Sequence, residues 1–187
     1  KTLGGDVLLP EKLAPVSILK KLPRIRWDEL LSGTISPSVD LTGWYREALD
    51  EYQGQTIYIP KMLMHPRKTW FVWPGTKLLF DPGCVMRANT AAWIDSGIEE
   101  TITGETRPDV GVLIANANWD ADEITDASIT ISGGKFVRDD AGAGNQGHAI
   151  LMRRVRGVLV DNVSVENGWN ATAFLACRDT IVTNSYA

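Results

Sequence analysis

The chain has 187 residues, 44% of them hydrophobic and 22% charged, with a formal net charge of −4. This composition fits one globular body, or one body with an arm, and excludes a disordered chain. No apolar run approaches the roughly 18 residues that cross a bilayer, so no membrane contact is expected.

The first segment, residues 1–38, differs from the rest in charge and proline content. Residues 1–39 carry six Lys or Arg and four Asp or Glu, net +2, whereas residues 40–187 carry thirteen and nineteen, net −6. An acidic body argues against nucleic acid as a partner. Four prolines prevent one long helix in the first segment, so we predict an extended arm that packs on the body or on another protein. Its candidate partner-binding residues, for which a solvated face is the alternative, are Lys20, Lys21, Arg24, Arg26 and Trp27.

One helix is predicted, from Asp40 to Tyr52, because apolar residues there recur at the spacing of one buried helical face. Asp40 suits the N-cap, and Gly54 suits the residue that ends the helix. The apolar residues of this face are Leu41, Trp44, Tyr45, Ala48, Leu49 and Tyr52.

Beyond the helix the sequence predicts short strands separated by Gly, Pro, Asn and Asp. The absence of a second amphipathic helix excludes a doubly wound α/β fold. The predicted strands are residues 55–60, 69–73, 76–81, 84–87, 110–116, 128–134, 148–153, 157–165, 172–177 and 180–185.

These strands repeat with a period near 22 residues. The repeating pairs are 158–160 with 180–182, 57–59 with 78–80, and 129–131 with 158–160, at offsets of 22, 21 and 29. The longest offset contains extra residues in the loop 139–147, and the segment 89–109 is a larger insertion. Such a period, with three strands per repeat, describes one coil of a parallel β-helix, in which each coil buries its apolar face on the next.

We therefore predict an all-β protein in which residues 39–187 form a capping helix and the first coils of a parallel β-helix. The coils are expected to continue beyond residue 187. In this arrangement Asn162 would stack on Asn184 as a side-chain amide ladder.

The order of signals also resembles a known superfamily. The segments VDLTGWYREALDEYQGQTIYIP, PGTKLLFDPG, ITISGGKF and GVLVDNVSVENG are similar to the start of the pectate-lyase-like right-handed parallel β-helix superfamily. That superfamily includes bacteriophage tailspikes and polysaccharide-degrading enzymes. The resemblance covers residues 39–187 and implies a right-handed β-helix solenoid; Gly43 and Trp44 depart from the small or Ile-type residues common in the family.

An arm ahead of the capping helix makes the chain most similar to the N-terminal part of a tailspike. The resemblance then implies a homotrimer in the virion, with the arm attached to a tail or baseplate protein. The β-helix would recognise, and could depolymerise, a host surface polysaccharide. The alternative is a secreted, extracellular polysaccharide lyase or glycoside hydrolase of the same superfamily.

One polar constellation, RDDAGAGNQGH, is a candidate for catalysis. Its Asp139 and Asp140, followed by His148, resemble the paired Asp and the Gly-His of polygalacturonases, and hydrolysis of a glycan uses two carboxylates. The spacing is shorter than in that family, and the family's downstream Arg-Ile-Lys is absent. The alternative interpretation is a polar, Gly-rich loop between coils.

Other residues carry weaker predictions. Trp169 could stack on a sugar ring, or it could pack on the outer surface of a coil. Three arginines, Arg153, Arg154 and Arg156, are predicted to be outward and salt-bridged rather than a substrate clamp. Cys84 and Cys177 form no CxxC pair, so we interpret both as small apolar fillers and predict no metal site, cofactor or disulfide.

Overall fold

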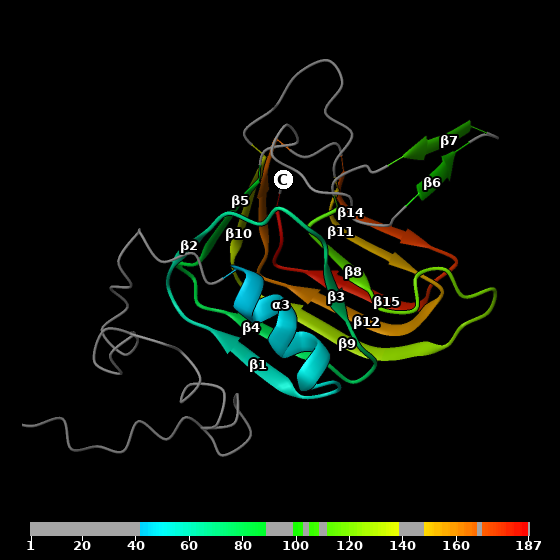
Figure 1. Ribbon diagram of the computed structural model, residues 1–187, viewed down its shortest axis with the longest axis horizontal. Helices are drawn as coiled ribbons and strands as arrows, with labels where there is room; N and C mark the ends of the chain where they lie inside the picture. The colour runs from blue at the N-terminus through cyan, green and yellow to red at the C-terminus, as the bar shows by residue number, and fades with distance from the viewer. Residues whose placement is uncertain are drawn as a thin grey trace, which may run out of the picture.

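The computed structural model describes residues 42–88, 99–102, 105–108, 112–138, 148–167 and 170–186. The predicted arm, residues 1–38, lies outside these ranges. Within them the chain is mostly β, with one α-helix, α3 (Thr42–Glu51), followed by short strands (Figure 1). The helix falls where the sequence predicted it, and Asp40, its predicted N-cap, lies outside the described residues.

All but two of the described strands belong to three parallel sheets. Sheet A contains, in spatial order, β1 (Thr56–Ile59), β4 (Lys77–Phe80), β9 (Asp126–Ser132), β12 (Val155–Asp161) and β15 (Arg178–Thr183). Sheet B contains β13 (Ser164–Glu166), β10 (Lys135–Arg138), β5 (Val85–Ala88) and β2 (Leu63–Met64). Sheet C contains β14 (Asn170–Leu175), β11 (His148–Arg153), β8 (Ile114–Asn116) and β3 (Trp70–Val72). Strands that follow one another along the chain visit sheets A, B and C in rotation.

The two remaining strands form an antiparallel hairpin between β5 and β8. They are β6 (Glu99–Ile102) and β7 (Glu105–Pro108), which pair with each other and stand apart from the three sheets in Figure 1. The hairpin falls inside the segment 89–109 that the sequence predicted as an insertion. The three sheets therefore keep their pairing although the chain leaves them at this point.

The strand register confirms the predicted repeat. Val158 of β12 lies beside Thr180 of β15, and Leu159 lies beside Ile181. On its other side, Val158 lies beside Ile129 of β9. The offsets of 22 and 29 residues therefore both connect parallel neighbours, and the extra residues of the longer offset fall between strands.

Some strand predictions need correction. The predicted strand 157–165 is two strands, β12 and β13, because Asn162 between them has a left-handed backbone with φ 53°. The sequence analysis also missed β2 and β10.

The predicted amide ladder between Asn162 and Asn184 is wrong. Asn184 does not donate its amide to Asn162; its Nδ2 donates to Asp161 Oδ1 at 2.9 Å.

The main apolar core lies between the inward faces of the three sheets and α3. Aromatic rings run through it from the helix inward: Tyr45 of α3 stacks on Trp70 at 6.0 Å between ring centroids, and Trp70 stacks on Phe80 at 6.5 Å. Phe80 in turn meets the edge of Phe136 at 5.4 Å. Offset and edge-to-face pairs of this kind stabilise a core beyond the area they bury. The helix thus contacts sheet C directly, and the chain of ring contacts continues from there into sheets A and B.

The two middle strands of sheet C, β8 and β11, are buried on both faces. Their outward residues Ala115 and Leu151 are fully buried beneath Trp119, in a second small apolar cluster that also includes Val112. This explains why β11 is a continuous apolar run and does not alternate, as is typical of strands covered on both sides. Cys84 is buried in the main core and Cys177 packs against it, so both are free apolar fillers as predicted.

Residues with left-handed backbones stack on one another in sheet A. Arg156 pairs with Ala127 and Val158 with Ile129, so Gly157 and Ser128 between them occupy the same register position. The same position recurs at every level of the sheet, before or within its strand. Its members are Gly54 (φ 71°), Gly75 (φ 79°), Ser128 (φ 59°), Gly157 (φ 75°) and Asp179 (φ 54°).

The two ends of the stack differ. At one end α3 lies against β3. At the other end β13, β14 and β15 are the outermost strands of their sheets, and apolar side chains there are exposed: Leu175, Ile181, Val182 and Tyr186. In the described part of the chain, no helix is both long enough and apolar enough to span a membrane.

Gly133 tests how tightly successive levels fit. A Cβ added to Gly133 would lie 2.2 Å from the carbonyl oxygen of Phe80 on the neighbouring strand, and its φ is 75°. We expect Gly133→Ala to lower the free energy of unfolding by about 3 kcal/mol or more, because it adds an overlap to the backbone strain. Urea denaturation followed by circular dichroism measures this.

Gly157→Ala is the matched control. Gly157 has the same φ of 75°, but the nearest atom to its added Cβ is 3.6 Å away. This variant should show the backbone strain alone, about 1 kcal/mol. Equal effects of the two substitutions would contradict the close fit of β9 against β4.

Candidate functional site

Polar residues gather at the corner where the chain leaves sheet B and enters sheet C. Arg138 ends β10, Glu166 ends β13 one level further along, and His148 begins β11. The predicted residues Asp139, Asp140 and Trp169 belong to the connections at this corner and lie outside the described residues. The arm residues Lys20, Lys21, Arg24, Arg26 and Trp27 also lie outside them.

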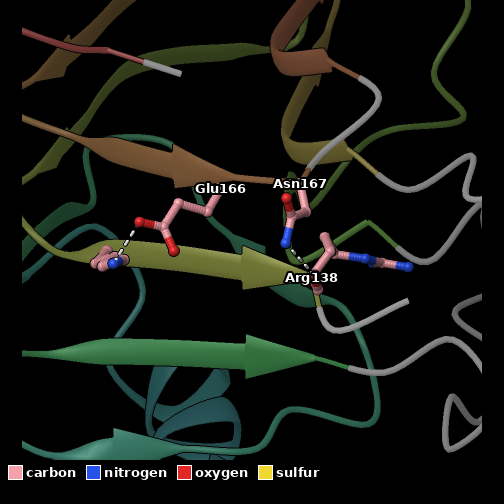
Figure 2. Close-up of polar contacts among 4 residues, drawn as sticks. Arg138, Glu166 and Asn167 are labelled. Atoms are coloured by element: carbon pink, nitrogen blue, oxygen red, sulfur yellow. Dashed lines mark hydrogen bonds and ion pairs between the residues drawn. The ribbon is translucent and has the colours of Figure 1, made fainter. Parts of the chain in front are cut away.

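Neighbouring levels are tied together at this corner by Asn167. Its Nδ2 donates to the backbone oxygen of Arg138 at 3.2 Å, and its own backbone is left-handed with φ 62°. Figure 2 shows the amide turned toward β10, while the Arg138 side chain extends past the end of that strand and away from Glu166. The strand ends from which segments 139–147 and 168–169 leave are therefore in contact.

Arg138 is unusual because its side chain has no solvent exposure. A buried guanidinium is costly unless polar groups surround it. Its position is the inward-facing end of β10, aligned with Ala88 of β5. The sequence analysis did not select Arg138, although it stands directly before the predicted Asp139 and Asp140.

His148 is 3% exposed and begins β11 in register with Asn170. Its backbone oxygen accepts a hydrogen bond from the N–H of Leu113 at 3.1 Å, which places the start of β11 firmly in sheet C. Proton transfer to a glycan requires the imidazole to reach the substrate. The catalytic role of His148 therefore stays a prediction.

The outer surface of sheet B next to this corner carries an ion pair. Lys135 Nζ lies 2.5 Å from Glu166 Oε1, and the two side chains are 40% and 50% exposed (Figure 2). Exposed pairs of this kind contribute less than about 1 kcal/mol to stability. The pair therefore leaves both groups accessible to a polar ligand without being required for folding.

A second polar cluster holds the turn between β8 and β9, and the sequence analysis missed it. The fully buried Asp126 accepts hydrogen bonds from Asn116 Nδ2 at 2.8 Å and from the backbone N–H of Asn118 at 3.1 Å. Asn116 also bonds both backbone groups of Arg153, accepting at 2.8 Å and donating at 3.0 Å. Because amides already surround this carboxylate, it serves structure rather than acid–base chemistry.

The three predicted outward arginines have different partners. Arg156 forms an exposed ion pair with Asp179 at 3.2 Å, as predicted. The salt-bridge prediction is wrong for the other two: Arg153 donates to the backbone oxygen of Trp119 at 3.3 Å and lies 5.8 Å from its ring centroid, and Arg154 donates to the backbone oxygen of Ala121. Both hold the turn that carries Trp119 over sheet C.

Two further potential nucleophiles are held protonated. Burial raises the pKa of Cys84 to about 12, so its thiol carries little thiolate near neutral pH. Burial, followed by a hydrogen bond to Asp81, raises the pKa of Tyr58 to about 12. That hydrogen bond runs from Tyr58 Oη to Asp81 Oδ2 at 3.0 Å.

Within the residues that the structure describes, no three His, Cys, Asp or Glu side chains are grouped so that they could hold a metal ion. No protein-family model, no curated protein and no solved structure matches this chain. The described polar groups at the corner between sheets B and C are the buried guanidinium of Arg138, the buried imidazole of His148 and the exposed ion pair of Lys135 with Glu166.

Asn116 connects three elements, and its removal should destabilise the fold. Asn116→Ala removes a donor from the buried Asp126 and both bonds to the backbone of Arg153, so we expect a loss of about 3 kcal/mol in the free energy of unfolding. Asn118→Ala keeps its backbone N–H bond to Asp126 and should cost about 1 kcal/mol. Thermal and urea unfolding of the two variants would contradict this role if their losses were the same.

Proposed function

We propose that the chain is the proximal part of a bacteriophage tailspike, a receptor-binding protein with a right-handed parallel β-helix closed at one end by α3. In this proposal residues 1–38 attach to the virion tail or baseplate, three copies assemble into a trimer, and the β-helix recognises a host surface polysaccharide. The resemblance of residues 39–187 to the pectate-lyase-like superfamily supports the proposal.

The observation that carries the proposal is the parallel pairing of strands visited in rotation. Each strand of sheets A, B and C lies beside the strand that occupies the same place in the preceding or following round of the chain. A solenoid of stacked coils accounts for this order, with neighbouring strands about 4.8 Å apart. It also accounts for the position of α3 at one end, because a solenoid needs a cap over its first coil.

The proposed glycan site is the corner between sheets B and C. Arg138 and Asn167 are in contact where the two connections begin, and His148 and Asn170 are in register where they end. Asp139, Asp140 and Trp169 therefore belong to connections on adjacent levels of one corner. Carboxylates beside an aromatic ring are a combination that binds and cleaves sugars.

Fold alone does not determine activity, because one scaffold supports many functions. An adhesive spike needs only the glycan contact, whereas a depolymerase also needs the carboxylates placed on either side of the scissile bond. A secreted lyase or glycoside hydrolase would use the same corner without the arm's attachment role. The two kinds of protein are distinguished by whether bound glycan is cut and whether residues 1–38 bind a tail protein.

The first test is glycan binding and cleavage by the purified chain. We expect retention of at least one capsular or lipopolysaccharide glycan on an array, and Trp169→Ala should weaken it roughly tenfold, as expected for loss of one aromatic stacking contact. Cleavage would be detected as new reducing ends or unsaturated uronates. Asp139→Ala and Asp140→Ala should abolish cleavage and leave binding intact.

Asp122→Ala is the control, since Asp122 is exposed in the turn between β8 and β9. Activity that survives both Asp139→Ala and Asp140→Ala would refute the catalytic assignment, and a panel without any bound glycan would refute the receptor-binding role. Sedimentation equilibrium should give three times the 20.6 kDa chain mass, and a monomer at all concentrations would refute the trimer.

A further inference from the structure

Three connections between sheets B and C leave their strands side by side. Ala88, which ends β5, is in register with Arg138, which ends β10. The backbone oxygen of Arg138 accepts the hydrogen bond from Asn167, which follows β13. In sheet C, where these connections arrive, β8, β11 and β14 are likewise neighbours. The connections that begin and end on adjacent levels of this corner are residues 89–113, 139–147 and 167–169.

The first two of these connections are acidic. Residues 89–113 carry five Asp or Glu and one Arg, net −4, and residues 139–147 carry two Asp and no Lys or Arg, net −2. Together they hold a net charge of −6, which equals the net charge of all of residues 40–187. The rest of residues 40–187 carries twelve acidic and twelve basic residues and is balanced. The net negative charge of the body is therefore concentrated on one corner.

The β6–β7 hairpin holds much of the charge of the first connection. Its two strands contain three glutamates and one arginine. Arg107 pairs in register with Glu100, whereas Glu99 and Glu105 are opposite uncharged residues. The hairpin belongs to none of the three sheets and stands apart from them (Figure 1). Its net charge of −2 is therefore carried by a part of the chain that the stack does not need for its pairing.

Basic residues near this corner do not cancel its charge. Arg87 of β5 and Arg138 of β10 reduce the net charge from −6 to −4, and the ion pair on sheet B adds none. The β2–β3 connection carries Arg67 and Lys68, but β2 is two levels away from β10. At about 4.8 Å per level that is about 10 Å, a distance over which physiological salt screens exposed charges. The proposed glycan residues Asp139 and Asp140 therefore belong to an acidic surface.

We propose that the glycan site at this corner takes a polysaccharide with free amino groups rather than one that bears uronates or phosphates. This inference rests on the proposed glycan-binding function and adds the charge of the ligand. A surface of one sign attracts ligands of the opposite sign and raises their local concentration. It also discriminates against ligands of its own sign, because like charges are brought together on binding. Amines repeated along a sugar chain would meet acidic connections on two adjacent levels.

Three hexasaccharides test the proposal by calorimetric titration of the full chain. They are the glucosamine hexamer, the N-acetylglucosamine hexamer, which has the same backbone without charge, and the galacturonate hexamer. At about pH 6 the carboxylates are ionised and the sugar amines are largely protonated. We expect the glucosamine hexamer to bind most tightly and the galacturonate hexamer not to saturate the chain. Raising sodium chloride from about 20 to about 500 mM should weaken the glucosamine hexamer about tenfold, because salt screens exposed charges.

A triple variant on the hairpin tests where the attraction originates. Replacing its three glutamates by glutamine should weaken the glucosamine hexamer about tenfold, as expected for three exposed charge pairs. The three substitutions are Glu99→Gln, Glu100→Gln and Glu105→Gln. The variant should keep the parental melting temperature, because the hairpin lies outside the three sheets.

The matched control removes the same amount of charge elsewhere. Its substitutions are Glu47→Gln, on an exposed residue of α3, and Asp122→Asn and Glu123→Gln, on exposed residues of the turn between β8 and β9. It should change the affinity for the glucosamine hexamer less than about twofold, as expected for screened distant charges.

Several outcomes would overturn the proposal. They are the absence of binding to the glucosamine hexamer, tighter binding of the galacturonate hexamer, and equal weakening by the two triple variants. If the glycan array retains only glycans with uronates or phosphates, this charge assignment fails while the receptor-binding role stands. An array without any bound glycan refutes the receptor-binding role itself. The two proposals therefore fail in different ways.

Discussion

The structure depends on hydrogen bonding between parallel strands that must repeat in register from one level to the next. A parallel ladder has evenly spaced bonds, and a one-residue slip would turn every inward side chain outward. The left-handed residues of sheet A show the constraint, since Ser128 and Asp179 adopt the same unusual backbone as the glycines at equivalent positions. At Gly133 the constraint is steric as well, because the backbone of Phe80 lies where a side chain would begin.

This constraint also determines where the chain can vary. Residues inserted within a strand would disrupt its pairing with each neighbouring strand, whereas residues inserted between strands leave all pairings intact. The β6–β7 hairpin and the segment 139–147 both fall between sheets B and C, while β8 and β11 remain aligned in sheet C at Ile114 and Ile150. Variable connections above a fixed scaffold are the usual location of binding residues. The same corner therefore carries the proposed glycan site.

The sequence predicted the helix, most strands and the returning register, because those features depend on local periodicity. It failed where the decisive partner is distant. The hydrogen bonds of Asn116 cross 37 residues to Arg153, and nothing in the local pattern distinguishes this Asn from a solvated turn residue. β10 was missed because it is four residues long and follows two glycines that read as a turn. The partner of Arg153, Trp119, likewise lies in the turn between β8 and β9, and the periodicity of the strands does not predict where that turn packs.

The helix end and the corner at Arg138 obtain their contacts in different ways. The helix covers one end of the core, where Tyr45 stacks on Trp70 of sheet C. The corner between sheets B and C instead gains its polar groups from strand ends, where inward positions such as Arg138 meet the connections. Substitutions of outward side chains at this corner, such as Glu166, leave the inward apolar positions untouched, so the surface can change while the pairing that supports it stays constant.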